Sequence, residues 1–281
     1  MDSDSLNSQL EHLYSSAEAA TYEGLVDEAI RRCETAMTLL DQNYEEELSF
    51  THSDFLMVAG HACWKDGDNE GAFRYYRQAY SMEMGRTDAL VAMGVALFYL
   101  CRFSAAAHYL ELASVEEPDS GEVWYFLGIL ALRAGDVQKA DFHFERAEEL
   151  EPERQRPVFL PVERISAILE EMYSRYPEDI RRAMENVPII LEDRPSEAML
   201  FSDNPPLDPL MLGIFEGTPL PERADNDLAA GLTRIVLFLE NIALVAPDEE
   251  KLIEELDITL KHEIGHFLGL DEDDLLARGL D

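Results

Sequence analysis

The sequence has few basic residues, few cysteines and no long apolar stretch. Lysine and arginine number 22 against 58 aspartates and glutamates, which gives a formal net charge of −36 over 281 residues. Residues 1–156 carry 30 acids and 12 bases, and residues 157–281 carry 28 and 10. A field of this sign repels phosphate backbones and anionic lipids, so we expect no nucleic-acid partner and no membrane partner. Solubility or adaptation to salt explains such a charge more simply than a dedicated basic partner.

The cysteines and the N-terminal residues indicate the cellular compartment of the protein. Cys33, Cys63 and Cys101 are odd in number and widely spaced within predicted helices, which argues against a disulfide framework and a cysteine metal site. The first four residues, Met1-Asp2-Ser3-Asp4, are acidic where a signal peptide would be basic. We therefore expect reduced thiols and a cytoplasmic protein. At 47% apolar, the chain can form cores for two modest domains.

The N-terminal half repeats itself with a period of 34 residues, which is typical of helix-turn-helix repeats. The paired positions are Gly94 and Gly128, Ala106 and Ala140, Leu110 and Phe144, Ala113 and Ala147, and Pro118 and Pro152. Earlier copies carry Gly60, Gly67, Ala72, Tyr76 and Ala79, and before them Ala17, Gly24, Ala29, Cys33 and Ala36. The first step is about nine residues longer, which predicts a longer helix or a loop near Asp41–Ser53.

The last copy resembles a tetratricopeptide (TPR) repeat. The resemblance rests on Trp124, Leu127, Gly128, Gly135, Ala140, Phe144, Ala147 and Pro152. It implies an all-α superhelix over residues 1–156 whose groove binds a protein or peptide. The five histidines of this half have no ligand-like spacing, so we expect no metal site there. An amphipathic helix over residues 157–175 is expected to cap the last hairpin or to bridge to the next domain.

After Tyr176-Pro177 the pattern becomes mixed, which predicts a small α+β domain over residues 176–281. A short helix is expected at 177–185, where proline and acids stand at its start. Apolar runs predict strands at 187–192, 210–215 and 233–239, with a further strand candidate at 242–245.

The C-terminal segment contains the pattern His262-Glu263-Ile264-Gly265-His266. On a helix, positions i and i+4 share a face, so both imidazoles can bind one metal ion while Glu263 points toward a bound water. The helix is expected to begin after Pro247 and to end at Gly269. Its packing face carries the apolar residues Ile253, Leu256, Leu260, Ile264 and Phe267, beside which Glu263 has no evident packing role.

A catalytic zinc site needs a third protein ligand. The pattern continues as HExxHxxGxxE, and Gly269 lets the chain turn sharply back toward the metal. Metzincins place their third ligand at the tenth residue after the first histidine, which is Glu272 in this sequence. Asp271 and Asp273 flank Glu272, so three carboxylates remain candidates for this ligand.

The stretch from Tyr176 to Leu275 resembles small bacterial zincin-like metallopeptidases. The resemblance rests on the expected helix and strand up to Asp193, the turn at 212–217, the strand at 234–238 and the segment 259–272. It implies zinc bound by His262 and His266, an acidic third ligand near Glu272, and Glu263 as the general base. Metzincins also carry a methionine turn downstream. Here no methionine follows His266, so the floor beneath the metal is expected to come from Met199 or Met211.

Three further polar residues have open roles. Thr259 and Asp257 are candidates for outer-shell partners of the ligands or for ordinary helix surface. Arg234 stabilises a developing oxyanion or pairs with an acid, and we favour the pairing.

The expected architecture is therefore a TPR superhelix followed by a small α+β zincin-like domain. One hypothesis is a cytoplasmic zinc-dependent metallopeptidase whose TPR array recruits a protein substrate or partner, with basic residues that complement the net charge. The other is a TPR adaptor whose zincin module binds metal without catalysis. Glu263 separates the two, because hydrolysis needs a general base and a structural metal site does not.

Overall fold

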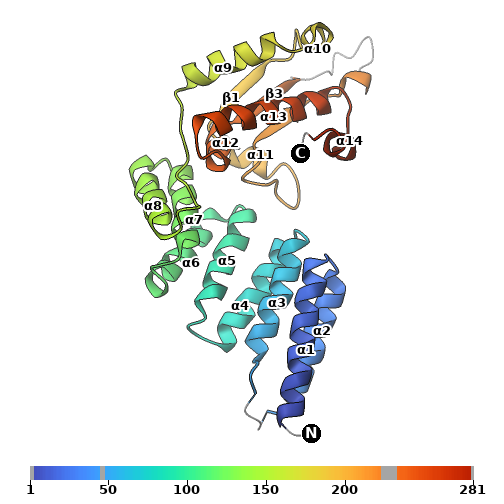
Figure 1. Cartoon of the computed structure of the whole chain (residues 1–281), viewed down its shortest axis with the longest axis vertical. Coiled ribbons are helices and arrows are strands. Elements are labelled where there is room, and N and C mark those ends of the chain that lie inside the picture. Colours follow the sequence, from blue (N-terminus) through green and yellow to red (C-terminus); the bar gives the residue numbers. More distant parts are fainter. Residues whose placement is uncertain (1–2, 45–47, 223–232, 280–281) are drawn as a thin grey trace. The chain divides into compact units, whose positions relative to one another are not determined.

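The computed structural model describes residues 3–44, 48–222 and 233–279. The chain forms two compact units, Met1–Arg154 and Gln155–Asp281 (Figure 1). Within the described residues, no helix is both long and apolar enough to cross a membrane.

The first unit consists of consecutive helix pairs, as predicted from the repeats. They are α1 (Ser3–Tyr22) with α2 (Val26–Gln42), α3 (His52–Lys65) with α4 (Asn69–Met82), α5 (Thr87–Tyr99) with α6 (Phe103–Glu116), and α7 (Gly121–Arg133) with α8 (Val137–Leu150). The two helices of each pair lie side by side, as Figure 1 shows for all four pairs. This is a TPR-like helical array.

Close contact between paired helices depends on glycine. A Cβ atom added to Gly94 would lie 2.6 Å from the Leu110 side chain, and one added to Gly128 would lie 2.6 Å from the Phe144 ring. The same arrangement recurs at Gly60 in the second pair. The 34-residue period therefore places the same small-to-large contact in successive pairs.

The turns within the pairs also repeat. Gly67 and Gly135 have φ angles of +82° and +78°, in the left-handed region that glycine adopts without steric cost. The equivalent position of the third pair is Cys101, which has a φ of +55°. A residue with a side chain thus occupies a turn position that is glycine in the second and fourth helix pairs.

The expected insertion after the first pair is partly helix. Helix α2 has 17 residues, whereas α4, α6 and α8 each have 14. Residues 45–47 of the segment that follows α2 lie outside the described residues.

The second unit contains a three-stranded sheet. Its strands are β1 (Ile189–Glu192), β2 (Gly213–Glu216) and β3 (Arg234–Phe238), in the order β1-β3-β2. Strand β3 is parallel to β1 and antiparallel to β2, with Ile235 opposite Ile189 and Phe215. The expected strands at 187–192, 210–215 and 233–239 thus contain or overlap the observed ones, and β2 is an edge strand.

Short and long helices complete this unit. They are α9 (Val162–Ser174), α10 (Glu178–Ala183), α11 (Glu197–Leu200), the 3-10 helix η1 (Leu220–Glu222), α12 (Leu239–Val245), α13 (Glu249–Phe267) and α14 (Glu272–Leu276). The strand candidate at 242–245 is wrong, because these residues form the end of α12. Two backbone carbonyls, of Pro209 and Met211, accept hydrogen bonds from the Asn241 side chain at the start of this helix.

Helix α9 corresponds to the helix expected over residues 157–175. Its buried residues Ile165, Ile168, Leu169 and Met172 are part of the core of the second unit. The second unit accordingly begins before residue 176, at Gln155.

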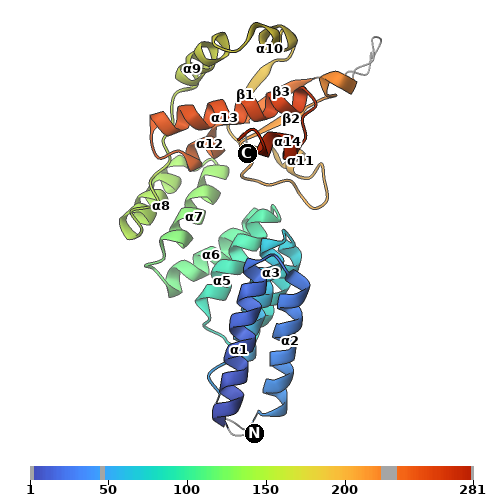
Figure 2. The ribbon, with the colours of Figure 1, turned by 45° about the vertical axis from the view of Figure 1, so that its right-hand side comes forward.

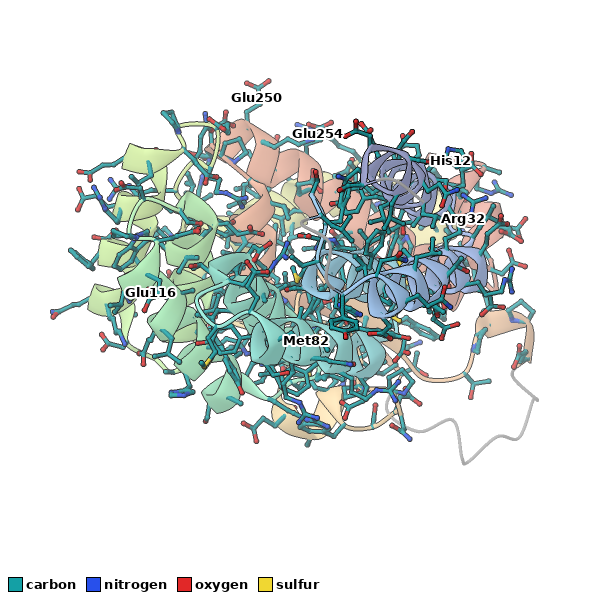
Figure 3. The ribbon with its side chains drawn as sticks, turned by 90° about the horizontal axis from the view of Figure 1, so that it is seen from below. His12, Arg32, Met82, Glu116, Glu250 and Glu254 are labelled. Carbon is teal, nitrogen blue, oxygen red and sulfur yellow. The ribbon has the colours of Figure 1, made fainter. Side chains whose placement is uncertain are left out.

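Helix α13 lies along the sheet and contacts β2 and β3 (Figures 1 and 2). Its residues Leu256, Leu260, Ile264 and Phe267 are buried in the same core as Ile235 of β3. Near the start of α13, Glu250 points away from the helix into solvent (Figure 3). The apolar face predicted for this helix is therefore the face that holds it on the sheet.

Candidate metal centre

Helix α13 presents its two histidines from one rigid element. The Asp248 side chain accepts a hydrogen bond from the Lys251 N–H and caps the first turn. The helix ends at Phe267, and Gly269 follows with a φ of +86°. A Cβ atom added to Gly269 would lie 2.8 Å from Pro221, so only glycine fits this turn. The chain then reverses into α14.

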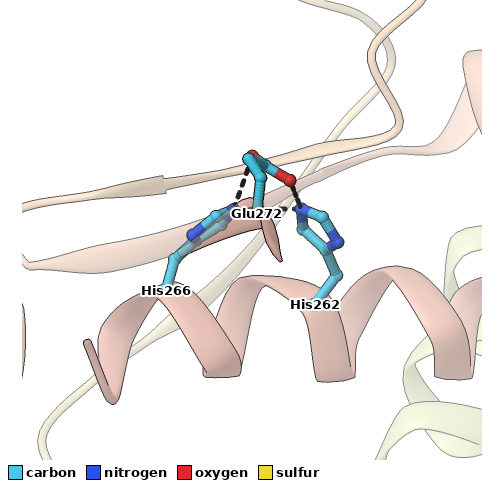
Figure 4. Close-up of side chains that lie close together, drawn as sticks. All are labelled: His262, His266 and Glu272. Carbon is cyan, nitrogen blue, oxygen red and sulfur yellow. Dashed lines mark hydrogen bonds and ion pairs between the residues drawn. The ribbon is translucent and has the colours of Figure 1, made fainter. Parts of the chain in front are cut away.

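Three predicted ligand atoms converge above α13 (Figure 4). The Nε2 atoms of His262 and His266 lie 3.0 Å apart. The Glu272 carboxylate lies 3.3 Å from His266 Nε2 and 3.8 Å from His262 Nε2. One donor atom from each residue falls within 4.8 Å of the others.

The structure distinguishes Glu272 from its neighbours. The Asp271 side chain accepts a hydrogen bond from the Asp274 N–H and caps α14. Within the described part of the chain, the group of ligand-type side chains around the two histidines contains Glu272 and neither Asp271 nor Asp273. A capped start to α14 thus directs the first residue of that helix toward the histidines.

The spacing and chemistry of this group fit zinc. Ligand atoms about 2.0–2.2 Å from a tetrahedral zinc lie about 3.3–3.6 Å from one another, close to the three separations observed. His266 Nδ1 lies 3.2 Å from the Leu270 carbonyl oxygen. If Nδ1–H donates to that oxygen, the lone pair of Nε2 faces His262 and Glu272, as metal binding requires. Two imidazole nitrogens and one carboxylate form a donor set that zinc accepts.

Residues 184–280 match the zincin-like metallopeptidase family. Residues 121–154 of the first unit match the tetratricopeptide repeat. No curated protein matches the sequence. Both matches agree with the resemblances found in the sequence, and the C-terminal unit is hereafter called the zincin-like domain.

Solved structures of MamA and YrrB are similar to about half of this chain. MamA is 17% identical with a TM-score of 0.43, over 51% of this chain and 79% of its own. YrrB, described as a TPR protein with an unusual peptide-binding site, is 16% identical with a TM-score of 0.41, over 50% and 68%. MamA from Desulfovibrio magneticus RS-1 is 17% identical with a TM-score of 0.42, over 52% and 77%.

Glu263 of the zincin-like domain is buried, with an exposed fraction of 5%. A Cβ atom added to Gly213 of β2 would lie 3.2 Å from Glu263 Cγ, so the side chain packs on the edge strand. Burial raises the pKa of Glu263 to about 7. The positive charge that His262 can carry and a hydrogen bond from the Phe215 backbone lower this pKa, but burial outweighs them. The expectation that Glu263 has no packing role is therefore wrong.

A cleft of about 580 Å³ opens beside these groups. Edge strand β2 contributes Gly213, Ile214 and Phe215 to its wall. The other lining residues are Gly217, Pro219, Glu222, His262, Glu263, His266, Gly269, Leu270, Asp271 and Glu272. Of the described residues that line it, four are acidic and none is lysine or arginine. Met199 and Met211 do not line it, so the expected methionine floor is not found at this cleft.

The three polar residues with open roles are placed as follows. Arg234 forms an ion pair with Glu216 across the β3–β2 pair, which agrees with the favoured interpretation. Asp257 accepts a hydrogen bond from the Tyr176 hydroxyl at 3.0 Å and pairs with Lys261. Thr259 is buried against Gly213, and its hydroxyl has no hydrogen-bond partner among the described residues. Asp257 thus ties α13 to the segment before α10.

Two backbone groups at the site could not be predicted from the sequence. The Leu270 carbonyl orients His266, and the Phe215 N–H bonds Glu263. Every residue carries such groups, so no residue type marks them in a sequence. The HExxHxxGxxE spacing could have indicated only that the chain after Gly269 returns to the second histidine.

Proposed function

We propose that the zincin-like domain is a zinc-dependent peptidase and that the TPR array recruits its protein substrate. The observation that carries the proposal is the convergence of His262, His266 and Glu272, with the buried Glu263 beside them. A structural zinc site usually has four protein ligands, whereas a catalytic site has three ligands with one open position and needs a general base beside the metal.

Each residue has a distinct role in this proposal. His262, His266 and Glu272 hold the zinc ion. When bound, zinc lowers the pKa of a coordinated water to about 7 and polarises a carbonyl group. The Glu263 carboxylate takes a proton on one oxygen and returns it to the leaving amine. The Phe215 N–H holds that carboxylate in place beside the ligands.

Edge strand β2 supports a peptide as the substrate. An edge strand offers the backbone groups that face away from its partner strand to an extended chain, which can add to the sheet as a further strand. On β2 the Phe215 N–H is not among them, because it bonds Glu263. Since β2 also forms a wall of the cleft, a peptide paired with it would pass the histidines. The acidic lining favours basic residues near the bond that is cleaved.

The proposal includes the surroundings of the protein. We place it in the cytoplasm, which agrees with three buried cysteines that form no disulfide. Its partners are proteins or peptides, and the net charge of −36 disfavours nucleic acid and anionic membranes.

A peptide-library cleavage assay tests the proposal. Purified protein is assayed on unfolded and basic peptides as zinc-loaded protein, after chelation, and after zinc is restored. We expect cleavage that is lost with the metal and returns with it. If the zinc-loaded protein binds metal but cleaves nothing in the set, the function is that of a TPR adaptor with a non-catalytic metal-binding module.

A further inference from the structure

A second pocket lies within the TPR array, between α3, α5 and the start of α7. This pocket, the array pocket, has a volume of about 330 Å³. We propose that the array pocket binds a protein segment in which a lysine or arginine stands beside an aliphatic residue. The proposal specifies the partner that the TPR array would recruit, and to that extent it rests on the proposed function.

The floor of the array pocket is apolar. Met57 and Tyr76 are buried beneath it, and the half-buried side chains of Val91 and Val95 line it from α5. Trp64 also lines the pocket and is 45% exposed, although it is one of the largest apolar side chains in the chain. An aliphatic side chain placed here would cover apolar surface that now faces water.

The rim of the array pocket is acidic. Asp88, Glu117 and Glu122 line it, and neither lysine nor arginine is among its described lining residues. Asp88 already pairs with Arg86 at 3.1 Å. Glu117 and Glu122, by contrast, form no ion pair with any described residue. Glu122 stands in the first turn of α7.

His61 does not offset this charge. Its ring lies 5.4 Å from the Tyr76 ring, and removal from water lowers the pKa of His61. The imidazole is therefore neutral at pH 7, and the pocket keeps two carboxylates without a counter-charge.

These features together select the occupant. Glu117 and Glu122 can accept hydrogen bonds from an ammonium or guanidinium group, and an aromatic face such as that of Trp64 attracts cations. An aliphatic neighbour in the same segment would lie on Val91 and Val95. An acidic segment would meet two uncompensated carboxylates within a chain of net charge −36, so it would be repelled.

Peptide binding to the full chain tests the proposal. The chain carries Glu263→Gln, which is expected to slow any cleavage by at least about 100-fold. The probes are capped peptides with arginine, glutamine or glutamate between two leucines. Binding is followed by fluorescence anisotropy at two salt concentrations. Glu117→Gln with Glu122→Gln is compared with Glu116→Gln with Glu153→Gln, which removes the same charge from exposed positions outside the pocket.

We expect the arginine peptide to bind at least about tenfold more tightly than the other two, and more weakly as salt is added. The double variant in the array pocket should lose about tenfold in affinity, whereas the control pair should lose little. Equal losses in the two double variants, or equal binding of the three peptides, or no binding, would overturn the proposal. Because the assay measures binding without hydrolysis, such a failure leaves the peptidase proposal standing.

Discussion

His262, His266 and Glu272 are held in place to different degrees. The side chains of the two histidines are 22% and 26% exposed and stand on a 19-residue helix. Glu272 begins a short helix, and its side chain is 78% exposed. The histidines are therefore preorganised, whereas the carboxylate completes the site from a more exposed position.

We expect this difference to appear in zinc affinity. His262→Ala or His266→Ala should abolish zinc binding, because one remaining histidine with a carboxylate holds the ion weakly. Glu272→Ala should weaken zinc binding by at least about tenfold. Metal analysis and competition with a chelator measure both effects. Asp273→Ala is the control and should bind zinc as the wild type does. If Asp273→Ala lost zinc while Glu272→Ala kept it, the third ligand would be Asp273.

At the scale of elements, the turn between α5 and α6 shows how one position departs from its repeat. Cys101 has a left-handed backbone where Gly67 and Gly135 occupy the equivalent turns. Its side chain is also buried, so replacing it with glycine removes packing as it relieves the backbone. Alanine and glycine at this position differ chiefly in backbone conformational preference.

We expect Cys101→Gly to be more stable than Cys101→Ala by about 1 kcal/mol, because alanine keeps the left-handed cost that glycine avoids. Urea unfolding gives the free energy of unfolding of both variants. In the reverse direction, Gly135→Ala should be less stable than the wild type by a similar amount. A Cys101→Ala variant as stable as Cys101→Gly would contradict this account of the turn.

The start of α3 has a reciprocal cap that includes an ion pair. The Asp54 carboxylate accepts hydrogen bonds from the Thr51 N–H at 2.8 Å and from Arg86 at 2.7 Å. Burial raises the pKa of Asp54, but the hydrogen bonds from Thr51 and Arg86 outweigh it, so the pKa is lowered. The resulting stability is present above the unfolded pKa of about 3.9 and is lost as pH falls through the lower folded pKa.

Asp54→Asn should therefore lower the free energy of unfolding by about 1 kcal/mol at pH 7. The difference from the wild type should shrink as the pH falls below about 4, because the wild-type carboxylate then becomes protonated. Urea unfolding at several pH values measures this. Asp66→Asn, at the exposed other end of α3, should change stability little at any pH. If the loss of unfolding free energy in Asp54→Asn were the same at every pH, it would contradict a role for the Asp54 charge.

Long sequence patterns predict the helices and strands better than short ones. The helix pairs were predicted because small residues recur at a fixed offset and force the same contact, as at Gly94 and Gly128. The strand expected at 242–245 is wrong, because a short apolar run fits a buried strand and a buried helix equally well. Glu263 was predicted as a site residue from its spacing, but its burial on Gly213 depends on how α13 lies on the sheet.

At the scale of the whole molecule, the chain consists of two units with separate cores. Each contributes about half of the net charge, and each contains an acid-lined pocket: the cleft of the zincin-like domain and the array pocket. The chemistry and the recruitment of a substrate are thus assigned to different parts of the chain in the proposed function.

This division predicts separable losses. A chain without residues 1–154 should still bind zinc and cleave short unstructured peptides, because every proposed catalytic group and the core around α13 lie in the second unit. Cleavage of a protein substrate should fall, since the TPR array would no longer capture it. Cleavage rates of a short peptide and of a protein containing the same sequence measure the two effects. Equal rates on the protein with and without the array would contradict the recruitment role.

The most direct test of the central claim is the zinc content and peptide cleavage of Glu263→Gln beside the wild type. Glutamine keeps the size of the side chain but cannot accept the proton, so the peptidase account predicts about one zinc ion per chain in both proteins and at least about 100-fold slower cleavage in the variant. Equal cleavage by the two proteins would contradict the assignment of Glu263 as the general base.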